Sequence, residues 1–377
     1  MLDSTLPPSS EYQLREYLSE NGVHHSSTIA EMCSINANRG DMISHNCSIK
    51  DFKESVFPTA YLLVFILGLV GHLVSMYVFF RVWRKKRYLT TVNQFMVNLL
   101  VSDLMLVCSL PFRASYYLSG STWIFGPVAC RLLFYIFYLN MYTSIYFLVS
   151  LNIMRYLALI QPYRYKHLQK WCNGHLVCLL IWLFVALTSS PLLLLRRHTN
   201  SSTDIAQQCM ELRNSNQTIQ HLIIMNNATL SVGFLLPLVC ILWCSVFVAY
   251  RLWKPGPSQR RVDISRKKAF ALVIISLSFF IICFLPYHVM RTVFLHTELD
   301  VSNNKIGDSC ETLWQVRKAA VVTLCLCVSH SCLDPILFFF VGENFRTFFA
   351  KLLRKKKTHT DNKKRIQKGA ELQNLQK

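Results

Sequence analysis

Seven apolar stretches constrain this chain more than any other feature of its sequence. They run over residues 57–80, 92–118, 127–154, 173–195, 223–250, 269–295 and 316–341. Each has the roughly 20 residues that a helix needs to cross a bilayer, and each has to be helical because lipid offers the backbone no hydrogen-bond partners. Only 16% of the residues are charged, below the roughly 25% of soluble domains. The sequence therefore predicts an all-α membrane protein, a bundle of seven transmembrane helices.

Positive charge is distributed unevenly between the segments that connect these stretches. Taken alternately, the segments form two sets, 81–89, 155–172, 251–268 and 342–377 on one side and 1–56, 196–222 and 298–313 on the other. The first set holds 27 Lys and Arg residues and the second holds 8. Cytoplasmic segments of membrane proteins carry the excess of Lys and Arg. We therefore expect the first set and the carboxyl terminus to face the cytoplasm, and the amino terminus to lie outside the cell.

This topology divides the chain into four parts. They are an extracellular tail (1–56), the seven-helix bundle (57–341), an amphipathic eighth helix (342–354) and a basic cytoplasmic tail (355–377). The eighth helix is indicated by phenylalanines spaced among basic residues, a pattern typical of helices that lie on membrane lipids. We expect a multi-pass protein of the plasma membrane. Its net charge of +20 is then a topology signal, which argues against a nucleic-acid partner.

Glycosylation acceptors and cysteines agree with this orientation. The Asn-x-Ser/Thr acceptors are Asn46, Asn200, Asn216 and Asn227, all in or at the edge of segments assigned outside. Five of the 14 cysteines lie outside or at an outer helix end, namely Cys33, Cys47, Cys130, Cys209 and Cys310. An oxidising exterior permits two disulfides among them and leaves one cysteine over. Spacing alone leaves the pairing open.

Isolated polar residues inside the apolar stretches carry the strongest functional signal. They are Asn98, Asp103, Asn140, Ser144, Arg155, His330 and Asp334. Ionisable residues within a membrane usually face the bundle interior and serve function. Further residues occur in order with them: Cys130, Trp182, Pro237, the string FxxCFLP that ends at Pro286, and DPxxF from Asp334. The ordered set resembles the rhodopsin-like (class A) family of G-protein-coupled receptors over residues 57 to about 355.

Several longer strings narrow this resemblance. LPFRASYYLSGSTWIFGPVACR, NMYTSIYFL, CFLPYHVMRTV and GENF are most similar to the cysteinyl leukotriene receptors. The purinergic nucleotide receptors are related and share much of the pattern, so a nucleotide receptor stays as the alternative. The resemblance implies the disulfides Cys130–Cys209 and Cys47–Cys310, with Cys33 spare.

The outer ends of the stretches offer chemistry for an anionic lipid. Arg113 and Arg291 can each hold a carboxylate through two parallel N–H bonds, while Lys53 supplies a point charge. Tyr287, His288 and Arg291 can share one helix face, as can Tyr138 and Tyr142. With the family resemblance, the predicted ligand-binding residues are Lys53, Arg113, Tyr138, Tyr142, Tyr287, His288 and Arg291. No Lys or Arg occurs from 319 to 341, where some nucleotide receptors carry one, so a leukotriene-like lipid is favoured.

A polar centre is implied deeper in the bundle. Asp103, Ser144 and Asp334 match positions that hold a sodium ion in inactive receptors of this family, whereas His72 and His330 stand where asparagine is usual. Two carboxylates in one dry site do not both ionise cheaply unless a cation is shared. Sodium, a proton on one Asp or a nearby histidinium could supply that charge. We hypothesise that protonation of His72 or His330 competes with sodium; the alternative is neutral histidines hydrogen-bonded in the bundle. No cofactor is expected beyond this allosteric sodium ion.

The inner face is predicted to contact a heterotrimeric G protein through Arg155, with Tyr156 beside it. The family usually has an acid before this arginine, but Met154 stands there, so the local ion pair cannot form. Ser245 and Phe338 replace two tyrosines whose hydroxyls commonly bridge the fifth and seventh spans. These departures predict a less stabilised active state or coupling through other contacts.

Sequence motifs and the polarity of the spans distinguish a receptor from an enzyme or a transporter. The sequence has no GxxxxGK[ST], HExxH or GxSxG, which argues against an enzyme. A transporter would need a polar path through both faces, but the inner halves of the fourth to sixth stretches are almost wholly apolar. We therefore expect a receptor for an anionic lipid, coupled to calcium mobilisation. The nucleotide receptor and the transporter remain as alternatives.

Overall fold

The structure is a computed structural model, and it describes residues 47–86, 90–171, 174–191, 193, 209, 216–253, 270–271, 273–303, 310–341, 345 and 348. Its named elements, all helical, are α3 (Lys50–Lys86), α4 (Thr91–Leu118), α5 (Gly126–Ile160), α6 (Pro162–Trp171), α7 (Gly174–Ser189), α9 (Asn216–Ala228), η1 (Thr229–Leu235), α10 (Leu236–Trp253), η2 (Phe279–Phe284), α12 (Leu285–Ser302) and α13 (Cys310–Val341). The segments η1 and η2 are π-helical.

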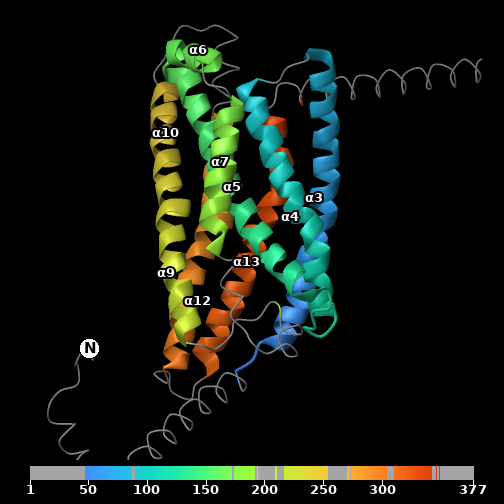
Figure 1. Cartoon of the computed structure of the whole chain (residues 1–377). Coiled ribbons are helices and arrows are strands. Elements are labelled where there is room, and N and C mark those ends of the chain that lie inside the picture. The colour runs from blue at the N-terminus through green and yellow to red at the C-terminus, as the bar shows by residue number, and fades with distance from the viewer. Residues whose placement is uncertain are drawn as a thin grey trace, which may run out of the picture.

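These helices form a bundle whose long rods run side by side, while α6 lies across one end (Figure 1). Around the bundle α3 packs on α4 and α13, α5 packs on α4, α7 and α10, and α12 packs on α9 and α13. Six helices in the described residues are long and apolar enough to cross a membrane, and α7 is a shorter apolar helix. This arrangement agrees with the predicted seven-helix bundle.

The distribution of side chains is the one expected of a protein surrounded by lipid. Large apolar residues cover the outside of the bundle, among them Leu63, Leu67, Leu180, Leu187 and Val239. Polar residues lie inside it, including His72, Asp103, Asn140, His330 and Asp334, which are almost completely buried. Polar side chains are expensive in lipid and turn inward, where other helices can supply hydrogen-bond partners.

The first helix begins earlier than the sequence predicted. It starts at Lys50 rather than at residue 57, so α3 extends into the segment 1–56 that was assigned to the extracellular tail. The early start has a local cause: Asp51 lies in the first turn, where a negative charge stabilises the helix amino terminus. Phe57 is buried and stacks on Tyr117, which joins this end of α3 to α4.

The predicted eighth helix is described at two positions only. Phe345 is buried against Phe79 of α3 and Phe338 of α13, and Phe348 packs on Tyr77 of α3. The rest of 342–354 lies outside the described residues. The amphipathic eighth helix therefore stays a prediction.

Both π-helical segments end two residues before a proline. Pro237 follows η1 and Pro286 follows η2. Proline has no amide hydrogen, and in a regular α-helix its ring clashes with the carbonyl four residues back. Wider π-helical turns are one way in which a continuous helix adjusts its hydrogen bonding around such a residue, and they are frequent at functional sites. The fifth and sixth spans consequently change from α-helical to π-helical geometry just before these prolines, close to the predicted ligand-binding residues Tyr287 and His288.

Close packing of α3 on α13 depends on Gly71. A Cβ atom added there would lie 2.8 Å from Cγ and 3.2 Å from Cβ of Pro335. The proline ring is rigid, so it cannot rotate out of the way. His72, the next residue, is thereby brought close to the interior of α13.

We predict that Gly71→Ala destabilises the bundle by about 1–3 kcal/mol, the usual cost of overpacking. The measurement is the thermal midpoint of the purified full-length protein in detergent micelles, which should fall by several degrees. Val70→Ala is the matched control because Val70 is exposed on the outer surface. An unchanged or raised midpoint for Gly71→Ala would contradict the packing argument.

Candidate functional site

Two disulfides hold the expected outer end of the bundle. Cys130 on α5 pairs with Cys209, and Cys47 pairs with Cys310 at the start of α13. Both predicted pairings are thus confirmed. Cys33 lies outside the described residues. The two bridges lie at the same end of the helices as the predicted cations.

Arg291 on α12 is held among neutral groups. Its Nε donates to Asn226 Oδ1 at 3.1 Å and its Nη1 donates to the Tyr287 hydroxyl at 3.2 Å. Its guanidinium carbon lies 5.0 Å from the centre of the Tyr138 ring, within cation–π range. Among the described residues these contacts are all with uncharged side chains. The arrangement therefore presents a positive charge that is oriented but not neutralised by them.

Asn226 is a site residue that the sequence reasoning missed. It is buried on α9, and its Nδ2 donates to Thr292 Oγ1 at 2.9 Å while its Oδ1 accepts from Arg291. One amide thus joins the fifth span to two residues of the sixth. Asn226 lies near the start of the apolar stretch 223–250 and four residues before Leu230, so the sequence pattern did not single it out from its polar neighbours Asn227 and Thr229.

Arg113 on α4 lies in the same aromatic cluster from the other side. It is 5% exposed, and its Nη2 donates to the Leu133 carbonyl at 2.6 Å. Its guanidinium lies 5.4 Å from the centre of the Phe137 ring, and the buried Tyr61 is beside it. The Phe137 ring in turn meets Tyr287 edge-on at 5.9 Å. Both predicted arginines therefore border one group of rings.

Further aromatic side chains of α5, η1 and α12 complete this cluster. Tyr138 and Tyr142 stack with ring centres 6.4 Å apart, and Tyr142 lies 6.2 Å from the His288 ring. His288 stacks on Phe234 at 4.4 Å. A Cβ atom at Gly233 would lie 2.6 Å from the Tyr142 ring, so this glycine allows the fifth span to approach the tyrosine.

His288 offers a directed polar atom within this aromatic cluster. Its Nδ1 donates to the Phe284 carbonyl at 2.9 Å, one helical turn back. In a neutral imidazole the other nitrogen, Nε2, is then an acceptor. Nε2 is buried and has no hydrogen-bond partner among the described residues. The site therefore includes an acceptor suited to a hydroxyl or amide donor.

A second missed feature lies at the outer ends of α12 and α13. Arg317 Nε and Nη2 donate to the two oxygens of Glu298 at 2.7 and 2.9 Å, and its Nη1 donates to the Cys47 carbonyl at 2.8 Å. Glu298 is 5% exposed. Two-pronged arginine–carboxylate pairs are strong and geometrically specific, so this pair clamps α12 to α13 next to a disulfide. Lys53 is half-buried in the first turns of α3.

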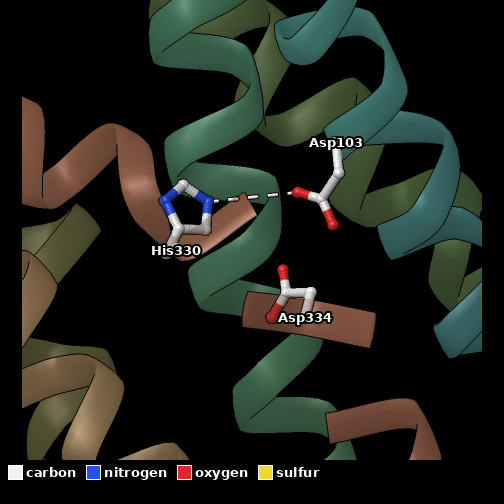
Figure 2. Close-up of side chains that lie close together, drawn as sticks. All are labelled: Asp103, His330 and Asp334. Atoms are coloured by element: carbon white, nitrogen blue, oxygen red, sulfur yellow. Dashed lines mark ion pairs between the residues drawn. The ribbon is translucent and has the colours of Figure 1, made fainter. Parts of the chain in front are cut away.

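The predicted polar centre is assembled deeper in the bundle. Asp103 Oδ1 accepts from Asn140 Nδ2 at 3.0 Å and from Ser144 Oγ at 3.5 Å. His330 Nε2 lies 4.0 Å from the same oxygen, and Asp334 faces the pair from the next turn of α13 (Figure 2). His72 Nε2 is 4.0 Å from Asp103 Oδ2. The structure thus brings together all five residues predicted for this centre.

The four predicted glycosylation acceptors lie in different surroundings. Asn46 and Asn200 lie outside the described residues, and Asn216 begins α9, where its Nδ2 donates to Asn303 at 3.2 Å. Asn227 lies inside α9 in the candidate span Asn216–Arg251, and the Thr229 hydroxyl donates to backbone carbonyls within the helix. Glycosylation at these four positions stays a prediction.

The family relationship of the chain decides among the remaining classes. Residues 73–338 match the family described as "7 transmembrane receptor (rhodopsin family)". The chain belongs to this family. It is therefore a G-protein-coupled receptor and a multi-pass membrane protein rather than an enzyme, and the receptor reading is preferred over the transporter that the sequence left open.

Similar receptors support this assignment. The chain is 40% identical over 312 residues to cysteinyl leukotriene receptor 2 of Homo sapiens, covering 83% of this chain and 85% of that receptor. It is 34% identical over 302 residues to cysteinyl leukotriene receptor 1 of Homo sapiens, with 79% and 85% covered. It is also 34% identical over 301 residues to the uracil nucleotide/cysteinyl leukotriene receptor of Homo sapiens, with 80% and 77% covered.

Near Arg155, neutral contacts join the spans. Tyr156 meets the Phe247 ring at 6.0 Å, which packs α5 on α10. Asn152 Nδ2 donates to Ser276 Oγ at 2.9 Å, and both residues are buried. This bond joins α5 to the sixth span. On α5 it is made by Asn152, three residues before Arg155. Sequence reasoning noted the missing acid at Met154 but did not identify this neutral bond.

We predict that Glu298 and Arg317 are energetically coupled. Single Glu298→Gln and Arg317→Gln variants should each lower the thermal midpoint of the purified receptor, because each leaves a largely buried charge without its partner. The double variant should lose less than the sum of the two, with a coupling of about 1–3 kcal/mol. Lys50→Gln, at the exposed Lys50–Glu54 pair, is the control and should change little. Strictly additive effects would exclude the clamp.

Proposed function

We propose that the receptor recognises an anionic lipid mediator of the cysteinyl leukotriene class at its extracellular end. In this proposal it then activates a heterotrimeric G protein and mobilises calcium. The observation that carries the proposal is the placement of Arg113 and Arg291 against one aromatic cluster. The amino terminus is then extracellular and the carboxyl terminus cytoplasmic, as the distribution of Lys and Arg indicates.

The chemistry of the cluster fits a ligand with separate acidic and apolar parts. A guanidinium binds a carboxylate through two parallel hydrogen bonds, and such charge-assisted bonds are stronger where water is excluded. The rings of Tyr138, Tyr142 and Phe137 supply apolar surface for an acyl chain. His288 Nε2 would accept from a hydroxyl or amide of the ligand. Each feature alone is common, but together they match an amphipathic acid.

The distribution of the remaining cations supports a carboxylate over a triphosphate. Arg317 already binds the Glu298 carboxylate, and Lys318 lies 5.9 Å from the centres of the Phe52 and Trp314 rings. Further along α13, residues 319–341 contain no Lys or Arg. A polyphosphate calls for denser positive charge than this. The nucleotide receptor nevertheless stays as the second candidate, because one similar receptor is named for both ligand classes.

Transmission to the G protein is proposed to run through the sixth span. This rod carries the ligand-site residues Tyr287, His288 and Arg291 directly after Pro286, and it carries Ser276 at its inner end. Outward movement of the inner part about Pro286 would break the bond to Asn152 and expose the surface around Arg155 to the G protein. A ligand drives such a change only through different affinities for the two states.

We predict that Arg113→Ala and Arg291→Ala each reduce the potency of a cysteinyl leukotriene by about 10- to 100-fold, because each removes charge-assisted hydrogen bonds to a carboxylate. The measurement is ligand-induced calcium release in cells that express equal surface amounts of each variant. Nucleotides are tested in parallel on every variant.

The controls for this experiment separate local contacts from loss of charge. Arg131→Ala removes an arginine at the outer end of α5 that is not part of the cluster, and its potency should remain close to wild type. Arg113→Lys and Arg291→Lys keep the charge but lose the planar, two-pronged geometry, so they should rescue only partly. Responses to all acidic lipids that survive the loss of both arginines would refute the proposal. A response to nucleotides alone would favour the second candidate.

We also predict that Ser276→Ala raises signalling without ligand. The hydrogen bond to Asn152 is neutral and should contribute about 0.5–1.5 kcal/mol to the resting state, so its loss should raise basal inositol phosphate accumulation about 2- to 10-fold. Ser245→Ala is the matched control, because Ser245 donates only to the Ile241 carbonyl of its own helix. A basal level in Ser276→Ala equal to that of Ser245→Ala would show that the bond does not restrain activation.

A further inference from the structure

We propose that the polar centre of the bundle binds a divalent transition-metal ion of the Zn²⁺ type, held by His330, Asp103 and Asp334. The family resemblance implies a sodium ion here. A nitrogen ligand does not suit sodium, whereas imidazole with carboxylates is a common ligand set for zinc. The inference concerns a site separate from the ligand cluster, so it stands or falls independently of the proposed function.

The orientation of His330 is that of a metal ligand. Its Nδ1 donates to the Cys327 carbonyl three residues back, which leaves the lone pair of Nε2 directed into the bundle in the neutral ring. Histidines that bind metals usually donate their other nitrogen to a backbone carbonyl or carboxylate in this way. Nε2 is buried, has no hydrogen-bond partner among the described residues, and points toward Asp103 (Figure 2).

The two carboxylates supply the remaining ligand atoms. Both residues are fully buried, and the polar contact of Asp334 is with the carboxyl group of Asp103, so the two carboxyl groups lie together. Ligand atoms of Asp103, His330 and Asp334 all lie within 4.8 Å of one another. In tetrahedral zinc sites the ligand atoms are about 3.3 Å apart, as bonds of about 2.0 Å require. Side-chain movements of roughly 1 Å would therefore close the site without a change of backbone.

Surrounding residues orient the carboxylate of Asp103. Asn140 and Ser144 donate to its Oδ1. His72 donates from Nε2 to the Ser331 carbonyl at 2.7 Å, so its ring is fixed 4.0 Å from Oδ2 rather than being available as a ligand through that nitrogen. Such outer contacts hold metal-binding side chains in place. Asn140 and Ser144 thus position Asp103, His72 lies beside it, and His330 would bind.

Charge favours a dication over sodium. If both carboxylates are ionised, one sodium ion leaves a net negative charge in a dry interior, whereas a divalent ion neutralises both. Uncompensated charge is expensive in such a place. A bound ion would also link α4, which carries Asp103, to α13, which carries His330 and Asp334. Metal binding should consequently raise the thermal stability of the bundle.

The test uses the purified full-length receptor in detergent micelles, prepared with an affinity tag that contains no histidine. Its thermal midpoint is measured in choline chloride, with added NaCl and with added ZnCl₂. At a Zn²⁺ concentration a hundredfold above the dissociation constant we expect a rise of about 5 °C. His330→Asn introduces the asparagine that is usual at this position in the family, and it should abolish most of the rise in thermal midpoint caused by Zn²⁺. His296→Asn, at an exposed histidine of α12, is the matched control and should retain it.

A spectroscopic measurement keeps the proposal falsifiable if His330→Asn does not fold. Co²⁺ replaces Zn²⁺ in such sites, and its visible absorption reports a low-symmetry site with nitrogen and oxygen ligands. We expect this absorption in folded wild type and its displacement by Zn²⁺. Absence of the absorption, an equal effect of Zn²⁺ on wild type and His330→Asn, or stabilisation of wild type by NaCl with none by ZnCl₂ would each overturn the proposal.

Discussion

The low polarity of the surroundings is the constraint on which the rest of this structure depends. In lipid each backbone amide must find its partner within the same helix, which is why seven apolar stretches suffice to indicate the fold. The same environment makes every polar group inside the bundle costly unless it is paired. The charged residues discussed above therefore lie in three paired clusters: the arginines with aromatic rings, the Glu298–Arg317 clamp and the centre at Asp103.

The arginines illustrate how neutral partners can hold a charge. Arg291 is oriented by the Asn226 amide, the Tyr287 hydroxyl and the face of Tyr138. None of these groups cancels its charge, so the cation keeps its attraction for an incoming anion. A carboxylate in the same place would have formed a buried ion pair and reduced that attraction. Arg317 shows this other outcome, because Glu298 binds it in two-pronged geometry. Similar residues at the same end of the bundle thus have different roles.

Sequence reasoning reached the elements and many of the site residues, and it failed where side chains from different helices had to be paired. Periodicity and apolar length placed the spans, and the resemblance supplied the two disulfides. The contacts between Asn226 and Arg291 and between Asn152 and Ser276 join residues that are far apart in the chain, and no local pattern encodes them. The early start of α3 was missed because the segment before residue 57 is polar, and apolar length does not register the helix-stabilising charge of Asp51 in the first turn. The acceptor motif at Asn227 did not indicate that its segment is helical, because the motif says nothing about whether a segment is folded.

The positions of the contacts on the sixth span suggest how binding and activation are connected. At its outer end the span is held to α13 by Glu298 and Arg317, and at its inner end one neutral bond joins it to α5. Pro286 and the π-helical η2 lie between these points. A charged, two-pronged pair is stronger than a single neutral hydrogen bond. A force applied by ligand at Arg291 should therefore leave the outer end in place and displace the inner end, where less free energy opposes movement. A receptor without an acid before Arg155 can still have a resting state in this way, but that state is restrained only weakly.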